Sequence, residues 1–210
     1  MIDPQVLRRR LLAAISVTSV LGLAIEILHA EAPGTVVDAL TPVLSLSYEG
    51  NVPTWFSSAL LLSCALAAGS IAAARPPMHR HWWGMALVAG YMSLDETAEL
   101  HEHLGGHLHT SGVLYFDWVI PAAAIVAVIG ALYLPFVRAL AEVTRRRLVI
   151  AAAIYIGGAL VMELPLGAWT DAHGAETLGY GLIDWVEETM EMVGAALALV
   201  ALVAHPKEPR

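Results

Sequence analysis

The sequence is poor in cysteine, lysine and charged residues, and each shortage excludes a class of function. Its 210 residues include one cysteine, Cys64, so a single chain can form neither a disulfide nor a thiolate metal cluster. The only lysine, Lys207, lies near the C-terminus, which excludes a retinal Schiff base inside a helix. Charged residues make up 14% of the chain and the net charge is -8, which argues against a nucleic-acid partner.

The chain is instead rich in long stretches of hydrophobic residues. Hydrophobic residues make up 58% of it, against roughly 45–50% in soluble proteins. A membrane-spanning helix needs about 20 mostly apolar residues. We therefore predict an all-α, polytopic bundle, a single transmembrane domain over residues 1–210, with six spans at 11–30, 56–75, 82–104, 116–137, 148–168 and 182–204. The long connection after the first span predicts a short helix on the membrane surface.

The positive residues predict the orientation of these spans. All eleven Lys and Arg lie in the N-terminus, the C-terminus and alternate loops, which six spans place on one side. Because positive flanks stay cytoplasmic, we expect both termini in the cytoplasm and the chain in a bacterial inner membrane. A cleaved signal peptide is the alternative, since Arg8–Arg10, an apolar run and Ala30-Glu31-Ala32 imitate one. The length of that run and the presence of Glu26 favour a retained helix.

The acidic residues show the opposite distribution, because all but Asp3, Glu142 and Glu208 fall in the outward half. Two segments, LDETAELHEHLG (94–105) and IDWVEETMEMVG (183–194), share the pattern Asp-x-x-x-Glu-x-x-Glu. Residues with this spacing lie on one face of a helix. Since the two spans are predicted to be antiparallel, their acidic stripes can face each other. The stripes are Asp95, Glu99 and Glu102 on the third span and Asp184, Glu188 and Glu191 on the sixth.

Two further acids, Glu26 and Glu163, each follow an Arg-Arg-Arg-Leu segment into a span and are expected at similar depth. Pro165 is expected to free the carbonyl of Val161 and to kink the helix beside Glu163. An ionised carboxylate at mid-span costs about 2.5–3.5 kcal/mol, so such acids need protons, histidinium or a metal ion. For those nearest the helix ends, Glu102 and Asp184, the alternative is simple hydration in the headgroup region.

Carboxylates with some imidazole suit hard or borderline divalent ions, and Fe, Mn or Zn is our expectation. The chain order of acids is similar to that of ferritin-like dimetal bundles, but glutamate stands where histidine is expected twice, so the analogy covers chemistry alone. The site holds one metal ion or two in this interpretation. The predicted ligands are Glu26, His29, Glu99, His103, Glu163, His173, Asp184 and Glu188.

Three motifs carry a resemblance that touches most of the chain. They are Glu49-Gly50-Asn51-Val52-Pro53-Thr54-Trp55-Phe56-Ser57, Ser93-Leu94-Asp95-Glu96 with Leu100-His101-Glu102, and Glu187-Glu188 with Glu191-Met192-Val193-Gly194. In these the chain resembles a group of uncharacterised bacterial multi-spanning membrane proteins. The resemblance implies a membrane protein and brings no activity with it.

The leading functional hypothesis is a metal-dependent membrane enzyme whose carboxylate site opens to the outer face, acting on a lipid or another small molecule. Asp95, Glu102 and Glu191 are then expected to complete the site or to act as general acid or base. Hydrolysis and oxygen-dependent oxidation both remain open. The alternative is a cation or proton-coupled transporter using the same carboxylates, although the cytoplasmic halves of the spans carry no acid to continue such a route. A sensory or structural subunit is a third option that leaves the clustered charge unexplained.

Overall fold

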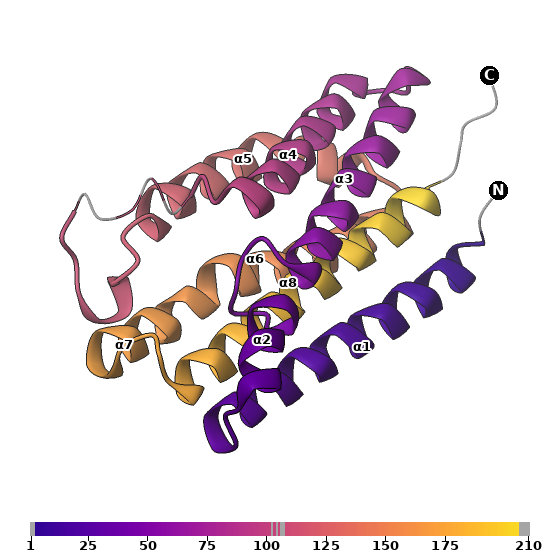
Figure 1. The fold of residues 1–210 in the computed structure, drawn as a ribbon. Helices are drawn as coiled ribbons and strands as arrows, with labels where there is room; N and C mark the ends of the chain where they lie inside the picture. Colours follow the sequence, from indigo (N-terminus) through magenta and orange to yellow (C-terminus); the bar gives the residue numbers. More distant parts are fainter. Residues whose placement is uncertain (1–2, 102, 104, 106–107, 206–210) are drawn as a thin grey trace.

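The computed structural model describes residues 3–101, 103, 105 and 108–205, which are helical or irregular and contain no strand. The helices form an elongated bundle in which the first turn of α1 and the last turn of α8 lie at the same end (Figure 1). The elements are α1 (Pro4–Glu31), α2 (Thr35–Leu44), α3 (Val52–Ala73), α4 (His79–Ala98), the short 3₁₀ helix η2 (Gly112–Leu114), α5 (Val119–Ala139), α6 (Glu142–Ile156), the π-helix η3 (Gly157–Met162), α7 (Glu163–His173) and α8 (Leu178–Val203).

Four helical runs in the described part of the chain are long and apolar enough to cross a membrane, namely Pro4–Glu31, Val52–Ala73, Val119–Ala139 and Glu142–His173. The last of these joins α6, η3 and α7 into one run. The spans predicted at 82–104 and 182–204 correspond to α4 and α8, whose acidic residues lower their apolar character. The short helix predicted after the first span is confirmed as α2.

Local sequence signals account for several helix starts. Asn51 caps α3 by accepting hydrogen bonds from the Thr54 N–H and hydroxyl, both at 3.1 Å, and Pro53 occupies the first turn, where no N–H is needed. Gly50 precedes the cap with a φ of 67°, which favours glycine. The motif around Asn51 is thus a helix start, and it fixes the turn that leads from α2 into α3.

The third predicted span must be corrected at its outer end, because α4 ends at Ala98 and not at residue 104. Glu99 follows in the left-handed region with φ 51°. The Asp95 carboxylate accepts a hydrogen bond from the His101 N–H at 2.9 Å, which replaces the bond that a continuing helix would offer. A side chain that captures the backbone in this way stops the helix before the predicted stripe is complete.

The helix α8 lies in the middle of the bundle and packs against α1, α3, α6 and η3. Polar contacts fasten it to α1, where the Trp185 indole N–H donates to the Ser19 carbonyl at 2.8 Å and the Ser19 and Thr189 hydroxyls lie 3.0 Å apart. Against α6 and η3 the approach is closer still. A Cβ on Gly158 would lie 2.8 Å from the Glu187 carbonyl oxygen, so only glycine fits there.

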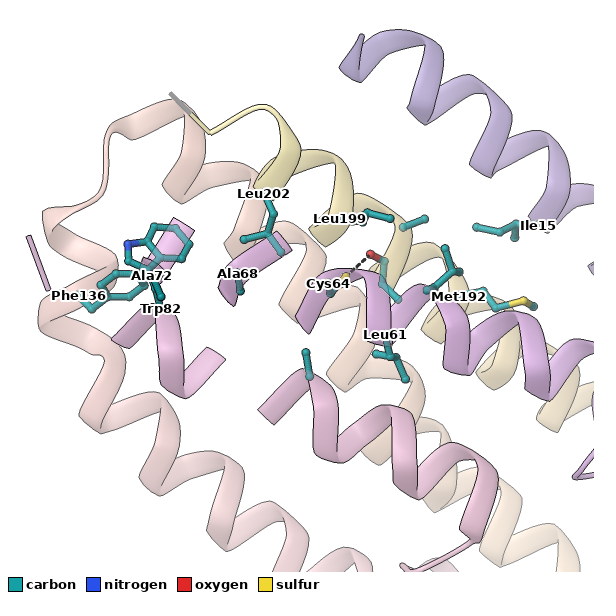
Figure 2. Close-up of a cluster of buried hydrophobic side chains, with 14 of the residues drawn as sticks. Ile15, Leu61, Cys64, Ala68, Ala72, Trp82, Phe136, Met192, Leu199 and Leu202 are labelled. Atoms are coloured by element: carbon teal, nitrogen blue, oxygen red, sulfur yellow. Dashed lines mark hydrogen bonds between the residues drawn. The ribbon is translucent and has the colours of Figure 1, made fainter. Parts of the chain in front are cut away.

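The apolar core occupies the half of the bundle that holds the ends of the chain, and Figure 2 shows its centre. Ala68 and Ala72 of α3 are fully buried against this part of α8, and the Cys64 thiol donates to the Ala195 carbonyl at 3.3 Å. The rings of Trp82 and Phe136 meet edge to face, 5.0 Å between centroids. Small side chains let the helices approach closely, as is typical of membrane bundles.

Candidate functional site

The part of α8 that precedes its apolar half, residues 184–191, carries four acidic residues that face the neighbouring helices. Asp184, Glu187 and Glu191 are buried, with at most 9% of each residue exposed, and Glu188 is half-buried. Carboxylates are almost never buried to this extent unless something compensates their charge. The helix therefore presents a row of acids to the protein interior and not to lipid.

Glu26 of α1 meets the outermost of these acids. It is buried, and its carboxylate accepts a short hydrogen bond from the Ser45 hydroxyl. A Cβ on Gly181 would lie 2.6 Å from Glu26 Oε2, so glycine at this position makes the room that the carboxylate occupies. Asp184 lies close enough to Glu26 for their charges to interact, and Ser47 is near it. The turn 45–51 thus delivers two serines to a pair of acids from different helices.

Glu163 approaches from the start of α7, directly after the π-helix. It is buried and close enough to Glu187 and Glu191 for electrostatic interaction. Tyr155 of α6 lies near the Glu191 carboxylate. The predicted disturbance of this helix by Pro165 coincides with the π-helical stretch Gly157–Met162, an irregularity that is common at functional sites.

Glu96 of α4 closes the arrangement from the remaining side. Both Glu188 and Glu191 lie within electrostatic range of it, and Ser57 of α3 is near its carboxylate. Seven acids from four helical segments therefore form one connected group, which we call the carboxylate cluster. Its members are Glu26, Glu96, Glu163, Asp184, Glu187, Glu188 and Glu191.

The residues predicted on the third span have other surroundings. Asp95 lies within electrostatic range of Glu96, but its carboxylate is engaged by His101, whose ring nitrogen is 3.0 Å away. Glu99 sits beyond the end of α4, so the stripe that linked it to Asp95 does not form. Glu102 lies outside the described residues. The prediction that these acids form one stripe assumed a helix that continues to residue 104, whereas α4 ends at Ala98.

The predicted imidazole ligands also have other contacts. The exposed His103 ring lies 2.8 Å from the Glu99 carbonyl oxygen. His29 pairs with Asp38 at 3.3 Å, and both side chains are about half exposed (45% and 53%). His173 is exposed and stacks on Trp169, 4.3 Å between ring centroids. Where the structure describes these rings, none belongs to the carboxylate cluster.

The cluster has unused bonding capacity. Asp184 Oδ2 and Glu187 Oε2 are buried and have no hydrogen-bond partner. Such oxygens are costly and call for an explanation, an ion being one. Within the described ranges, however, no three His, Cys, Asp or Glu side chains are already grouped as a metal ion would need them.

Sequence reasoning did not select Glu96 or Glu187 as site residues, nor the hydroxyls of Ser45, Ser47, Ser57 and Tyr155. A signal for Glu187 was present, since it lies three residues after Asp184 and so shares a helical face with it. Each hydroxyl comes from a different segment than the acid that it approaches, so only the packing of the chain reveals them.

Comparison with known proteins supports the resemblance at the level of a family. No match was found among curated proteins or among solved structures. A family model described as Domain of unknown function (DUF8692) matches residues 10–205, nearly the whole chain. Because the match covers so much of the sequence, the chain belongs to this DUF8692 family.

Proposed function

We propose that the protein is an integral membrane protein whose carboxylate cluster binds a divalent metal ion and uses it in an enzymatic reaction. One observation carries this proposal: seven acids from four helices are linked by electrostatic interactions, and among the described residues two of their buried oxygens, Asp184 Oδ2 and Glu187 Oε2, lack a hydrogen-bond partner. The arginines of these helices, Arg8–Arg10 of α1 and Arg80 of α4, lie near the opposite helix ends from Glu26 and Glu96, so the charge of the cluster needs an external positive ion or protons.

The membrane arrangement we propose has six spans, with α4 and α8 as the third and sixth. Their acids are consistent with spanning, because those of the cluster face other helices and are kept from lipid. The clustering of all Lys and Arg at the ends of alternate spans supports termini in the cytoplasm and a place in a bacterial inner membrane. The cluster then lies in the outer half of the bilayer.

The donor set suits a hard or borderline ion such as Fe, Mn or Zn, held by carboxylates from α1, α7 and α8. The ligands we propose are Glu26, Glu163, Asp184, Glu187 and Glu188. Since no ligand trio is preformed among the described residues, ion binding requires these side chains to rotate inward. A bound ion would supply a Lewis acid or an activated water for a lipid or small-molecule substrate. Glu191, which lies near Tyr155, is the residue we propose to accept or donate a proton.

Proton-coupled transport is the second candidate, and the hydroxyl partners favour it. Ser45 donates a hydrogen bond to Glu26, and Tyr155 lies near Glu191, and such neighbouring hydroxyl and carboxyl groups suit proton transfer. Against it stands the apolar packing of Ala195, Ala196, Leu199 and Leu202, which closes the route toward the cytoplasm. A carrier would have to open this half of the bundle.

Elemental analysis of the detergent-purified protein tests the proposal. We expect near-stoichiometric Fe, Mn or Zn in the wild type, loss of the metal in Glu188→Gln, and retention in Glu142→Gln. Glu142 is an exposed residue at the start of α6 and controls for the loss of one negative charge. If the protein contains no metal and instead moves protons into liposomes in a process that depends on Glu188, the transporter proposal holds and the enzyme proposal is wrong. Protein with neither property would overturn both proposals.

A further inference from the structure

A second charged feature lies at the opposite end of the bundle, at the turn between α3 and α4. An open hollow of about 680 Å³ is lined there by Arg75, His79 and Arg80, with Trp83 and Leu87 continuing along α4. The hollow shares no residue with the carboxylate cluster, which draws on α4 only at Glu96. It therefore needs an explanation of its own.

The cations around this hollow are available to a ligand. Arg75 and Arg80 are exposed and His79 is partly exposed. The ion pairs formed within the described residues, His29–Asp38 and His101–Asp95, involve none of them. Two arginines that converge on one hollow without a carboxylate suit an anion with several oxygens, such as a phosphate group.

Hydrogen bonds fix the backbone of the turn that carries these cations. The Arg75 backbone N–H donates to the Ala72 carbonyl at 2.9 Å, and the His79 N–H donates to the Pro76 carbonyl at 3.0 Å. Two consecutive prolines, Pro76 and Pro77, further limit the backbone. The backbone of the turn is therefore ordered before a ligand binds, and the cost of ordering falls on the exposed arginine side chains.

Below the cations the surface becomes apolar and stays exposed. Trp83 is 47% exposed and Leu87 is 73% exposed. The Trp83 ring also packs closely over α3, because a Cβ on Gly69 would touch it at 3.5 Å. A free phosphate would use the cations alone, whereas a phospholipid would use both the cations and this apolar strip. Basic pockets on the cytoplasmic side of membrane helices are suited to anionic headgroups.

We propose that the α3–α4 turn binds an anionic phospholipid of the cytoplasmic leaflet. Arg75, His79 and Arg80 contact the headgroup phosphate, and Trp83 and Leu87 line the upper part of an acyl chain. The inference rests on the proposed membrane orientation and is independent of any ion in the carboxylate cluster.

The test uses the full chain in nanodiscs containing phosphatidylglycerol and phosphatidylcholine, with the lipid retained after detergent extraction measured by native mass spectrometry. We expect the wild type to retain phosphatidylglycerol preferentially and the double variant Arg75→Gln/Arg80→Gln to lose about tenfold of that preference. The double variant Arg145→Gln/Arg146→Gln removes the same charge at the start of α6 and should keep the preference.

Three results would overturn the inference. They are equal retention by both double variants and the wild type, an equal loss in both double variants, and displacement of phosphatidylglycerol by millimolar inorganic phosphate. The last would identify a simple anion site. Metal content measured on the same samples separates this outcome from the fate of the carboxylate cluster, since the Arg75→Gln/Arg80→Gln variant should keep its metal.

Discussion

Residues 184–191 and 195–202 of α8 are consecutive parts of one helix, both packed inside the bundle, and they differ completely in chemistry. The first part buries Asp184, Glu187 and Glu191, and the second buries six apolar residues including Ala195 and Leu202. Around the acids lie hydroxyls from the turn 45–51, from α3 and from α6, whereas around the apolar part lie Ala68, Ala72 and Trp82. A single helix therefore passes through two kinds of interior, a polar one around residues 184–191 and an apolar one around residues 195–202.

The largest effect on stability is expected from placing an acid in the apolar interior that surrounds residues 195–202 of α8. Ala68→Asp puts a carboxylate at a fully buried position in the apolar core. We expect a loss of about 3 kcal/mol, the cost of an unpaired charge at the centre of a span. Chemical denaturation in detergent measures it. Ala68→Ser is the control and should change little, because serine can bond back to its own helix. If Ala68→Asp is as stable as the control, the two halves do not differ as described.

A smaller effect is expected where α8 meets the π-helix. Gly158→Ala introduces a Cβ at 2.8 Å from the Glu187 carbonyl and 3.0 Å from Glu191 Cγ, and overpacking of this kind costs about 1–3 kcal/mol. It should also weaken ion binding by shifting Glu187. The matched change Gly130→Ala lies on α5 with nothing within 4 Å, and it should stabilise the helix by about 0.5–1 kcal/mol. Equal effects of the two changes on unfolding would contradict the close approach.

The smallest effect is expected from the hydroxyls of the acidic half. Ser45→Ala removes the donor to Glu26 and should cost about 1–2 kcal/mol, because the buried carboxylate loses a partner. Ser63→Ala removes a hydroxyl that bonds only to its own helix, at the Ala59 carbonyl, and should be close to neutral. A Ser45 variant as stable as the Ser63 variant would show that Glu26 does not depend on this contact.

How far the sequence predicts this structure depends on how local the signal is. Helix positions follow from apolar length, and the burial of Glu26, Glu163 and the α8 acids follows from the cost of charge in lipid. The end of α4 cannot be predicted in this way, because the helical pattern of the sequence continues to residue 104. In the structure the Asp95 carboxylate accepts a hydrogen bond from the backbone beyond the helix, and the helix ends earlier. The approach of Ser45 to Glu26 depends on the folding of the 45–51 turn over α1 and is invisible to spacing.

The same distinction explains the candidate ligands. The acids of α8 were recognisable from their period on a helix, whereas Glu96 lies about 100° around the helix from Asp95, beside the stripe that the sequence favours. The histidines lie in connections and at helix ends, where no periodic rule fixes the direction of a ring. His103 accordingly engages Glu99 of its own segment, and His29 of α1 pairs with Asp38 of the next helix, α2.

The most direct test of the central claim is thermal unfolding of the purified protein as Mn²⁺ is titrated. An ion that binds only the folded state at a hundred times its dissociation constant adds about 2.7 kcal/mol of stability. We predict that Mn²⁺ raises the unfolding temperature of the wild type and of Glu142→Gln but not that of Glu187→Gln. An unfolding temperature that is indifferent to Mn²⁺, Zn²⁺ and Fe²⁺, or a Glu187→Gln variant that responds as the wild type does, would contradict the account.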